Sequence, residues 1–270
     1  MIEYIAALLM STGIGIIAAI IGLGGGFLFI PTLSLVFGLD PRMAIGTSLA
    51  IMVFTSVSAS IFYKKQGLIL TRVALVLMIS SIPTSLAGSF IITIIDGRIL
   101  VLIFCLMLTL VSLEMLLPRF RFLKDVRIGP SFVLAATVPN QGSQPVNRIW
   151  YSHLIFWGAM GGLLSGVTGT SGGAVFVPAL ATAGIPMHYA VATSMFAIIV
   201  VAVTGASMNV VYNQIAWPLV AVFGAGAAAG AFIGTRLAPV INEARIRKIF
   251  GIFLLCIVPI MFHQKVLGGF

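Results

Sequence analysis

The sequence predicts an all-α polytopic membrane protein made of two inverted repeats of about five segments each, with helices broken at glycine-rich motifs. The first observation is composition, because 60% of the 270 residues are hydrophobic and only 8% are charged, whereas a soluble surface needs about a quarter of its residues charged. The second is charge placement, since the charges cluster and leave neutral runs that hold about eight full spans, or up to about ten segments if some are short. The third is an internal repeat.

The repeat links a glycine-rich pattern in the first half of the chain to the same pattern in the second half. Seven residues of the first half align without a gap with identical residues of the second half. They are Gly15, Gly22, Gly25, Gly26, Phe29, Pro31 and Leu33, which match Gly162, Gly169, Gly172, Gly173, Phe176, Pro178 and Leu180 in that order. One deletion later, a further set matches: Gly38, Thr47, Ser48 and Gly88 with Gly184, Thr193, Ser194 and Gly234. We therefore expect a first membrane repeat over 1–117, a cytoplasmic connector over 118–150 and a second membrane repeat over 151–270.

Each copy is expected to contain five helical segments. The neutral run 4–39 is too long for one span and short for two, so its glycine cluster divides it. Asp40 and Pro41 then supply an N-cap and a proline at the first helical position. The predicted segments are 4–21, 27–37, 41–63, 71–95 and 98–117 in the first copy, and 151–168, 174–184, 187–212, 216–239 and 244–262 in the second.

Basic residues occupy different loops in the two copies. Lys64, Lys65 and Arg72 lie in the loop after the third segment, whereas the matching loop 212–217 is uncharged and the later stretch 236–248 is basic. Under the positive-inside rule the basic stretches and the connector are cytoplasmic, both termini are outside, and the two copies face opposite ways. The alternative is a pair of parallel repeats with a chance charge asymmetry. The pattern leaves open whether the short segments cross the membrane or re-enter.

Discontinuous helices at matching places of inverted repeats are typical of a substrate site near the bilayer midplane. The helix after each break, starting at Phe27 or Ala174, presents unsatisfied N–H groups at the positive end of its dipole, and two such ends favour an anion. No acidic or basic residue lies mid-span, so dipoles and hydroxyls would have to hold that anion. The predicted substrate-binding residues are Gly24, Gly25, Gly26, Thr47, Ser48, Thr170, Ser171, Gly172, Gly173, Thr193 and Ser194. For the glycines the alternative is close helix packing, and for Thr47 and Thr193 it is a hydroxyl bonded to its own helix.

These motifs resemble the sulfite exporter TauE/SafE family of the toluene-sulfonate uptake permease group. The resemblance covers nearly the whole chain and is carried by Gly-x-x-Gly-Gly-x-x-x-x-Pro-x-Leu early in each half, the Thr-Ser pair that follows, and the basic connector. It implies a multi-pass inner-membrane transporter of sulfite, sulfonates or related organic anions. It places the motif at Gly22, Gly25, Gly26, Pro31, Gly169, Gly172, Gly173 and Pro178. The second copy departs from the glycine triplet, with Thr170-Ser171 where the first copy has Leu23-Gly24.

We therefore predict a transporter, in the export direction, of a small sulfur-containing oxyanion. We expect the protein to be embedded in the lipid bilayer. No nucleic-acid partner is expected, because the basic residues lie at the ends of apolar runs and indicate topology. An anion channel is the first alternative, since broken helices also line channels. The oligomeric state is left open.

An intramembrane serine protease is the second alternative, because Gly169-Thr-Ser171-Gly172 fits a Gly-x-Ser-Gly pattern. A nucleophilic serine needs a base, and His153, His188 and His263 all fall near predicted helix ends, so no enzyme is predicted. No metal or cofactor is predicted either, since the two cysteines, Cys105 and Cys256, have no His or Cys at ligand spacing.

Overall fold

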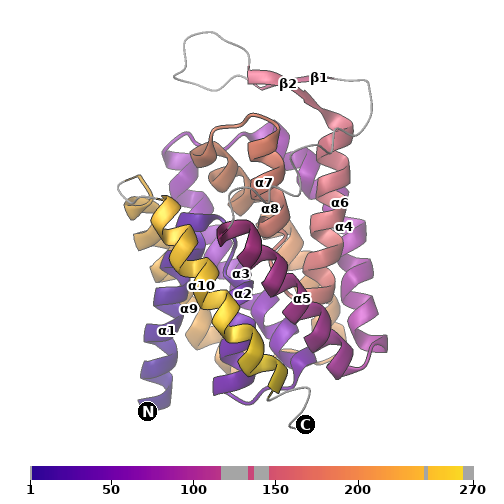
Figure 1. The fold of residues 1–270 in the computed structure, drawn as a ribbon, viewed down its shortest axis with the longest axis vertical. Coiled ribbons are helices and arrows are strands. Elements are labelled where there is room, and N and C mark those ends of the chain that lie inside the picture. The colour runs from indigo at the N-terminus through magenta and orange to yellow at the C-terminus, as the bar shows by residue number, and fades with distance from the viewer. Residues whose placement is uncertain (1, 117–132, 137–145, 240–242, 264–270) are drawn as a thin grey trace.

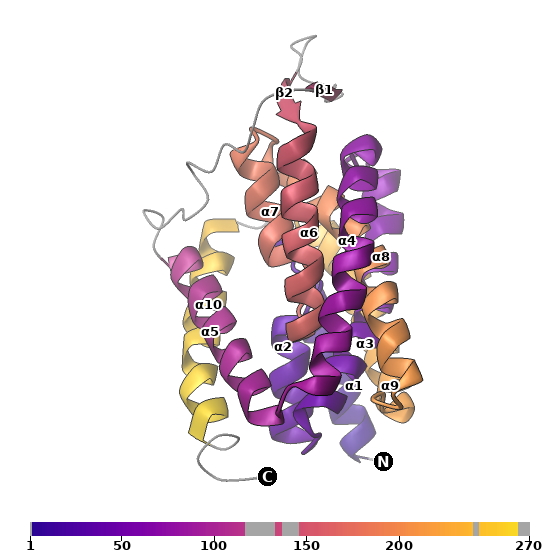
Figure 2. The same cartoon turned by 90° about the vertical axis from the view of Figure 1, so that its right-hand side faces the viewer.

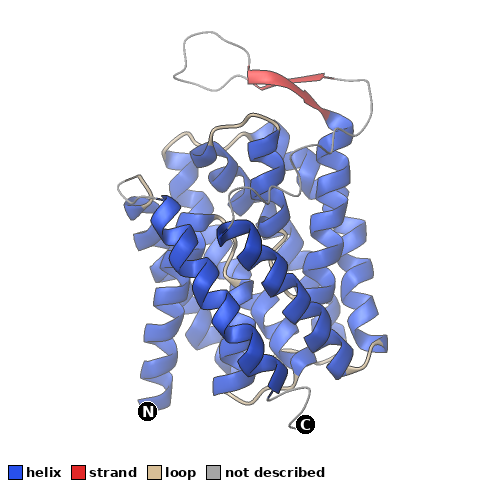
Figure 3. Cartoon of the chain, viewed as in Figure 1, coloured by secondary structure: helices blue, strands red, loops and turns tan. Residues whose placement is uncertain are grey.

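The computed structural model describes residues 2–116, 133–136, 146–239 and 243–263, and it is built almost wholly of helices (Figure 3). In chain order the elements are α1 (Ile2–Ile21), α2 (Gly26–Pro31), the π-helix η1 (Thr32–Val36), α3 (Pro41–Lys65), α4 (Thr71–Ile94), α5 (Gly97–Leu116), β1 (Val133–Ala136), β2 (Val146–Trp150), α6 (Tyr151–Thr168), α7 (Gly173–Thr182), α8 (Met187–Val211), α9 (Trp217–Leu237) and α10 (Glu243–Phe262). Among the described helices α1, α3, α4, α8 and α9 are long and apolar enough to cross a bilayer. The predicted all-α polytopic class is confirmed.

Local sequence explains where α3 begins and why α2 changes its winding. The Asp40 carboxylate accepts a hydrogen bond from the Arg42 N–H at 3.1 Å, and Pro41 occupies the first turn, as predicted. Pro31 lies at the end of α2 and has no N–H to donate, and the chain continues from it as η1. The sequence did not predict the antiparallel pair of β1 and β2, which lies within the connector.

The bundle has two ends that we name by what lies there (Figures 1 and 2). The start of α1 and the end of α10 lie at one end, the termini end, and the paired strands β1 and β2 lie at the other, the connector end. Helix α1 begins at the termini end, whereas α6, its equivalent in the second copy, begins beside β2 at the connector end. Helices α1 and α6 therefore run through the bundle in opposite directions, as the predicted inverted repeats require.

The short helical segments turn back from the centre of the bundle. After α1 and a first break at Gly22–Gly25, the segment α2–η1 leads within a few residues to α3, which begins at the termini end. There the Arg42 guanidinium donates to the Ile95 carbonyl oxygen at 2.7 Å, which ties the start of α3 to the end of α4. After α6 and a second break at Gly169–Gly172, α7 returns in the same way to the connector end. Each copy thus opens with a helical hairpin that turns at its glycine-rich break.

The first helix of each copy packs along the fourth helix of the other copy. Helix α1 lies against α9, and α6 lies against α4, with glycines at both contacts. A Cβ atom on Gly234 would lie 2.5 Å from the Ile16 carbonyl oxygen, and a Cβ atom on Gly166 would lie 2.5 Å from the Ser85 carbonyl oxygen. Small residues therefore let these backbones approach closely, as is usual between membrane helices.

The membrane orientation of the two ends is a prediction that labelling can test. Gln66 and Tyr212 are both exposed and lie at opposite ends of the bundle. Each would be replaced by a single cysteine in a protein without Cys105 and Cys256. Tyr212 is a better position than its neighbour Asn213, whose φ of 53° suits asparagine but strains cysteine. An impermeant thiol reagent added outside should label Tyr212→Cys and spare Gln66→Cys. Labelling of both from outside would refute the proposed orientation.

Candidate functional site

The two glycine-rich breaks cross in the middle of the bundle, where hairpins from opposite ends meet. A Cβ atom on Gly26 would lie 2.6 Å from the Gly169 carbonyl oxygen, and one on Gly173 would lie 2.5 Å from the Gly22 carbonyl oxygen. Between these two contacts, a Cβ atom on Gly24 would lie 2.6 Å from the Ser171 Cβ atom. The structure therefore brings together the predicted site residues of both breaks, and all of them are buried.

A helix starts at each side of this crossing with unsatisfied N–H groups. The N-cap of α2 is Gly25, with a φ of 96°, and the N-cap of α7 is Gly172. Neither helix receives a side-chain cap, so its first N–H groups are donors at the positive end of its dipole. Both helices begin one residue earlier than predicted, at Gly26 and Gly173.

The second break adds hydroxyl groups that the first break lacks. The Ser171 side chain is fully buried, and its Oγ atom has no hydrogen-bond partner. The Thr170 hydroxyl pairs with that of Thr168 at 2.5 Å, and Thr168 is a residue that the sequence reasoning missed. A buried hydroxyl without a partner costs about 1 to 3 kcal/mol, and Ser171 carries such a hydroxyl at the crossing. The two halves of the crossing are thus chemically unequal.

Ser48 and Ser194 hold the breaks from the opposite copy. The Ser48 hydroxyl donates to the Gly169 carbonyl oxygen at 2.9 Å, and the Ser194 hydroxyl donates to the Gly22 carbonyl oxygen at 3.0 Å. Each of these serines therefore lies at the crossing, and its hydrogen is directed to the protein backbone. Their role in this structure is to fix the end of each break.

Thr47 and Thr193 each accept a hydrogen bond from a backbone N–H of the other copy. The Ala216 N–H donates to the Thr47 hydroxyl at 3.0 Å, and the Leu70 N–H donates to the Thr193 hydroxyl at 3.1 Å. These N–H groups precede α9 and α4, so each threonine caps a helix of the other copy. Both hydroxyl oxygens are therefore bonded to backbone at the starts of α9 and α4.

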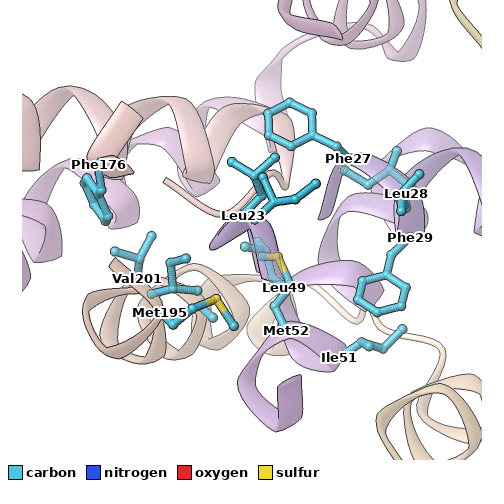
Figure 4. Packing of buried hydrophobic residues seen from close by; sticks show 14 of the residues in the cluster. Leu23, Phe27, Leu28, Phe29, Leu49, Ile51, Met52, Phe176, Met195 and Val201 are labelled. Carbon is cyan, nitrogen blue, oxygen red and sulfur yellow. The ribbon is translucent and has the colours of Figure 1, made fainter. Parts of the chain in front are cut away.

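Large apolar side chains surround the crossing and exclude water from it. Figure 4 shows Leu23 of the first break lying among Phe27, Leu49 and Met195, all of which are buried. No acidic or basic residue occurs in the breaks or in α2 and α7. In such low-dielectric surroundings, dipoles and hydroxyl donors act on a charge more strongly than they do in water.

The geometry gives the serine of the second break no catalytic partner. Ser171 Oγ makes no hydrogen bond, whereas His153, on α6, has its Nε2 atom 3.3 Å from the Ala179 carbonyl oxygen. Within the described part of the chain, the Ser171 Oγ atom therefore has no base in hydrogen-bond contact with it.

Comparison with known proteins identifies a family of membrane transporters. The model of the family described as Sulfite exporter TauE/SafE matches residues 7–261. The "Probable membrane transporter protein YunE" of Bacillus subtilis (strain 168) is 27% identical over 239 residues, which covers 85% of this chain and 85% of that protein. A "Probable membrane transporter protein" of Xylella fastidiosa (strain 9a5c) is 26% identical over 249 residues, covering 90% of this chain and 89% of that protein. No solved structure matches the chain significantly.

Proposed function

This chain is a multi-pass membrane transporter of the sulfite exporter TauE/SafE family, and from that premise we propose that it exports a small sulfur-containing oxyanion, such as sulfite or an organosulfonate, across the inner (plasma) membrane. The observation that carries the proposal is the unpartnered, fully buried Ser171 hydroxyl at the uncapped start of α7. Within the membrane interior such a group needs an acceptor, and an oxyanion supplies one.

The donors at the crossing suit an oxyanion better than a cation. Helix α7 and the continuous segment α2–η1 both start at the breaks. Their first N–H groups, at the positive ends of the helix dipoles, therefore lie at the breaks. The hydroxyl of Ser171 adds a neutral donor, and no basic side chain is present to hold the anion too tightly for release. Neutral donors of this kind stabilise a charge while allowing it to leave again.

The burial of the crossing favours a carrier over an anion channel. Residues Gly22–Gly26 and Gly169–Gly173 are all buried, so the described part of the chain holds the breaks closed to solvent. A carrier passes through such a closed state while its substrate moves from one side to the other.

Replacing Ser171 with alanine should weaken anion binding by about three- to tenfold, because one neutral hydrogen bond contributes about 0.5 to 1.5 kcal/mol. Purified protein would be titrated with sulfite, sulfate, thiosulfate, sulfoacetate and taurine while its thermal unfolding is followed. The ligand-free variant should unfold at no lower temperature than the parent, since it loses only a buried, unpaired hydroxyl.

Ser60→Ala is the matched control, because Ser60 is also buried with an unpartnered hydroxyl but lies near the far end of α3. Ser60→Ala should bind every anion as the parent does. If Ser171→Ala also keeps the parent affinity for each anion that stabilises the protein, Ser171 does not contact the substrate.

A further inference from the structure

Two apolar side chains press against the outer glycine of each break. A Cβ atom on Gly22 would lie 3.0 Å from Val191 Cγ1 and 3.1 Å from Val177 Cγ2. A Cβ atom on Gly169 would lie 2.8 Å from Ile45 Cγ2 and 3.1 Å from Ile30 Cδ1. The two pairs occupy equivalent places, because Val177 and Ile30 each precede the proline of the motif, and Val191 and Ile45 each precede its Thr-Ser pair by the same spacing.

Two recesses lie toward opposite ends of the bundle, and each is lined by at least one side chain of these pairs. The recess at the connector end is lined by Val191, Ile20, Tyr63, Gln66 and His188 among others. The recess at the termini end is lined by Ile30, Ile45, Ser34, Pro41 and Leu100 among others. The termini-end recess therefore stops at Ile30 and Ile45, and the connector-end recess stops at Val191, whose neighbour at Gly22 is Val177.

We infer that these pairs are the two gates of the transport path, with Val177 and Val191 closing the connector-end recess and Ile30 and Ile45 closing the termini-end recess. The inference rests on the proposed transport of an anion through the crossing. Apolar constrictions block a hydrated ion because they offer no replacement for its water. Both pairs are closed here, so the structure is an occluded state with the crossing shut off from both sides.

The hydrogen bonds around each pair couple the gate to its break. The Ser194 hydroxyl bonds both the Gly22 carbonyl oxygen and the Val191 carbonyl oxygen, each at 3.0 Å. The Ser48 hydroxyl bonds both the Gly169 carbonyl oxygen and the Ile45 carbonyl oxygen, each at 2.9 Å. A movement of Val191 or Ile45 that opens a recess therefore also strains the bond that fixes the break. Access and the shape of the binding site change together.

The gates can be tested by measuring which side of the membrane reaches a cysteine at the crossing. Ser171→Cys is introduced in a protein without Cys105 and Cys256, and an anionic methanethiosulfonate reagent is added to right-side-out or inside-out vesicles. With both gates intact, labelling should be slow from either side. Val191→Ala or Val177→Ala should raise the labelling rate at least about tenfold from the connector side alone, because the apolar constriction is widened.

The other gate should respond from the other side. Ile45→Ala or Ile30→Ala should raise the labelling rate by a similar factor from the termini side alone. Each gate has two independent variants, so one that fails to insert does not end the test. Val201→Ala in α8 and Ile51→Ala in α3 are matched controls, because both truncate fully buried side chains on the same helices. Neither control should change labelling from either side.

Two results would overturn the inference: faster labelling in the controls as well, or faster labelling from the same side for both pairs. Labelling is independent of transport, so this outcome is separable from a failure of the proposed function. Side-specific labelling without flux of any sulfur oxyanion would leave the gates in place and reject the substrate class. If the protein transports a sulfur oxyanion but none of the four gate variants changes the labelling rate, the gates are rejected and the proposed function stands.

Discussion

Replacing Gly173 with alanine is expected to abolish anion transport while leaving the protein in the membrane. The new Cβ atom would lie 2.5 Å from the Gly22 carbonyl oxygen, a contact between two backbones that no rotamer change can relieve. Overpacking of this kind costs about 1 to 3 kcal/mol, and here the breaks would have to separate at the point where the anion is proposed to bind. Uptake into inverted vesicles should fall to background, and Gly26→Ala should behave alike, since its Cβ atom would lie 2.6 Å from the Gly169 carbonyl oxygen.

Gly13→Ala provides the control for this experiment. A Cβ atom on Gly13 meets no atom within 4 Å, although Gly13 lies in α1, the helix that leads into the first break. This variant should transport at the parent rate, and its helix should be slightly more stable because alanine favours helix over glycine. Normal transport by both Gly173→Ala and Gly26→Ala would show that the crossing is not on the substrate path.

An inside-negative membrane potential should by itself drive export to a roughly fiftyfold concentration ratio at about 100 mV, because moving one charge across that potential changes its energy by about 2.3 kcal/mol. Among the described residues whose side chains are placed, the acidic groups lie at the starts of helices: Asp40 accepts from the Arg42 N–H and Asp96 accepts from the Arg98 N–H. No carboxylate is thereby placed mid-span to relay protons or hold sodium. We therefore expect electrogenic movement of the anion alone.

Proteoliposomes with a potassium diffusion potential would measure this directly. Anion flux should run away from the negative side when sodium is absent and the pH is equal on both sides, and it should reverse when the potential is reversed. Flux that ignores the potential but follows a sodium or proton gradient would show that a coupled ion drives the cycle.

Local features of the sequence predicted the helices well because membrane helices are defined by local signals. The glycine cluster after Ile21 disfavours helix and ends α1, and Asp40-Pro41 starts α3 where capping chemistry requires it. The fourth segment of the second copy, predicted as 216–239, is α9 at Trp217–Leu237. The strands β1 and β2 were missed because each is short and depends on its partner, which local periodicity does not reveal.

The hydroxyl residues of the candidate site show where local reasoning ends. Thr47 and Thr193 are equivalent in the repeat, and that equivalence suggested a shared role near the substrate. Their role as caps became visible only when the fold placed Ala216 and Leu70 beside them. The hydrogen-bond partner of a hydroxyl depends on which groups the fold brings close to it. A sequence can therefore identify a polar residue in a membrane helix without identifying the group that it binds.

The packing of each copy's first helix against the other copy constrains the order in which the protein can assemble. During synthesis α1 leaves the ribosome first, but α9, the helix along which it finally packs, begins only at Trp217. The glycine face of α1, including Gly15 against Ala227, therefore has no lasting neighbour until nearly the whole chain has been inserted. Helix α6, by contrast, can dock on α4 as soon as it follows the connector. The first helix of the second copy can therefore pack early, whereas α1 cannot pack along α9 until the fourth segment of the second copy has been made.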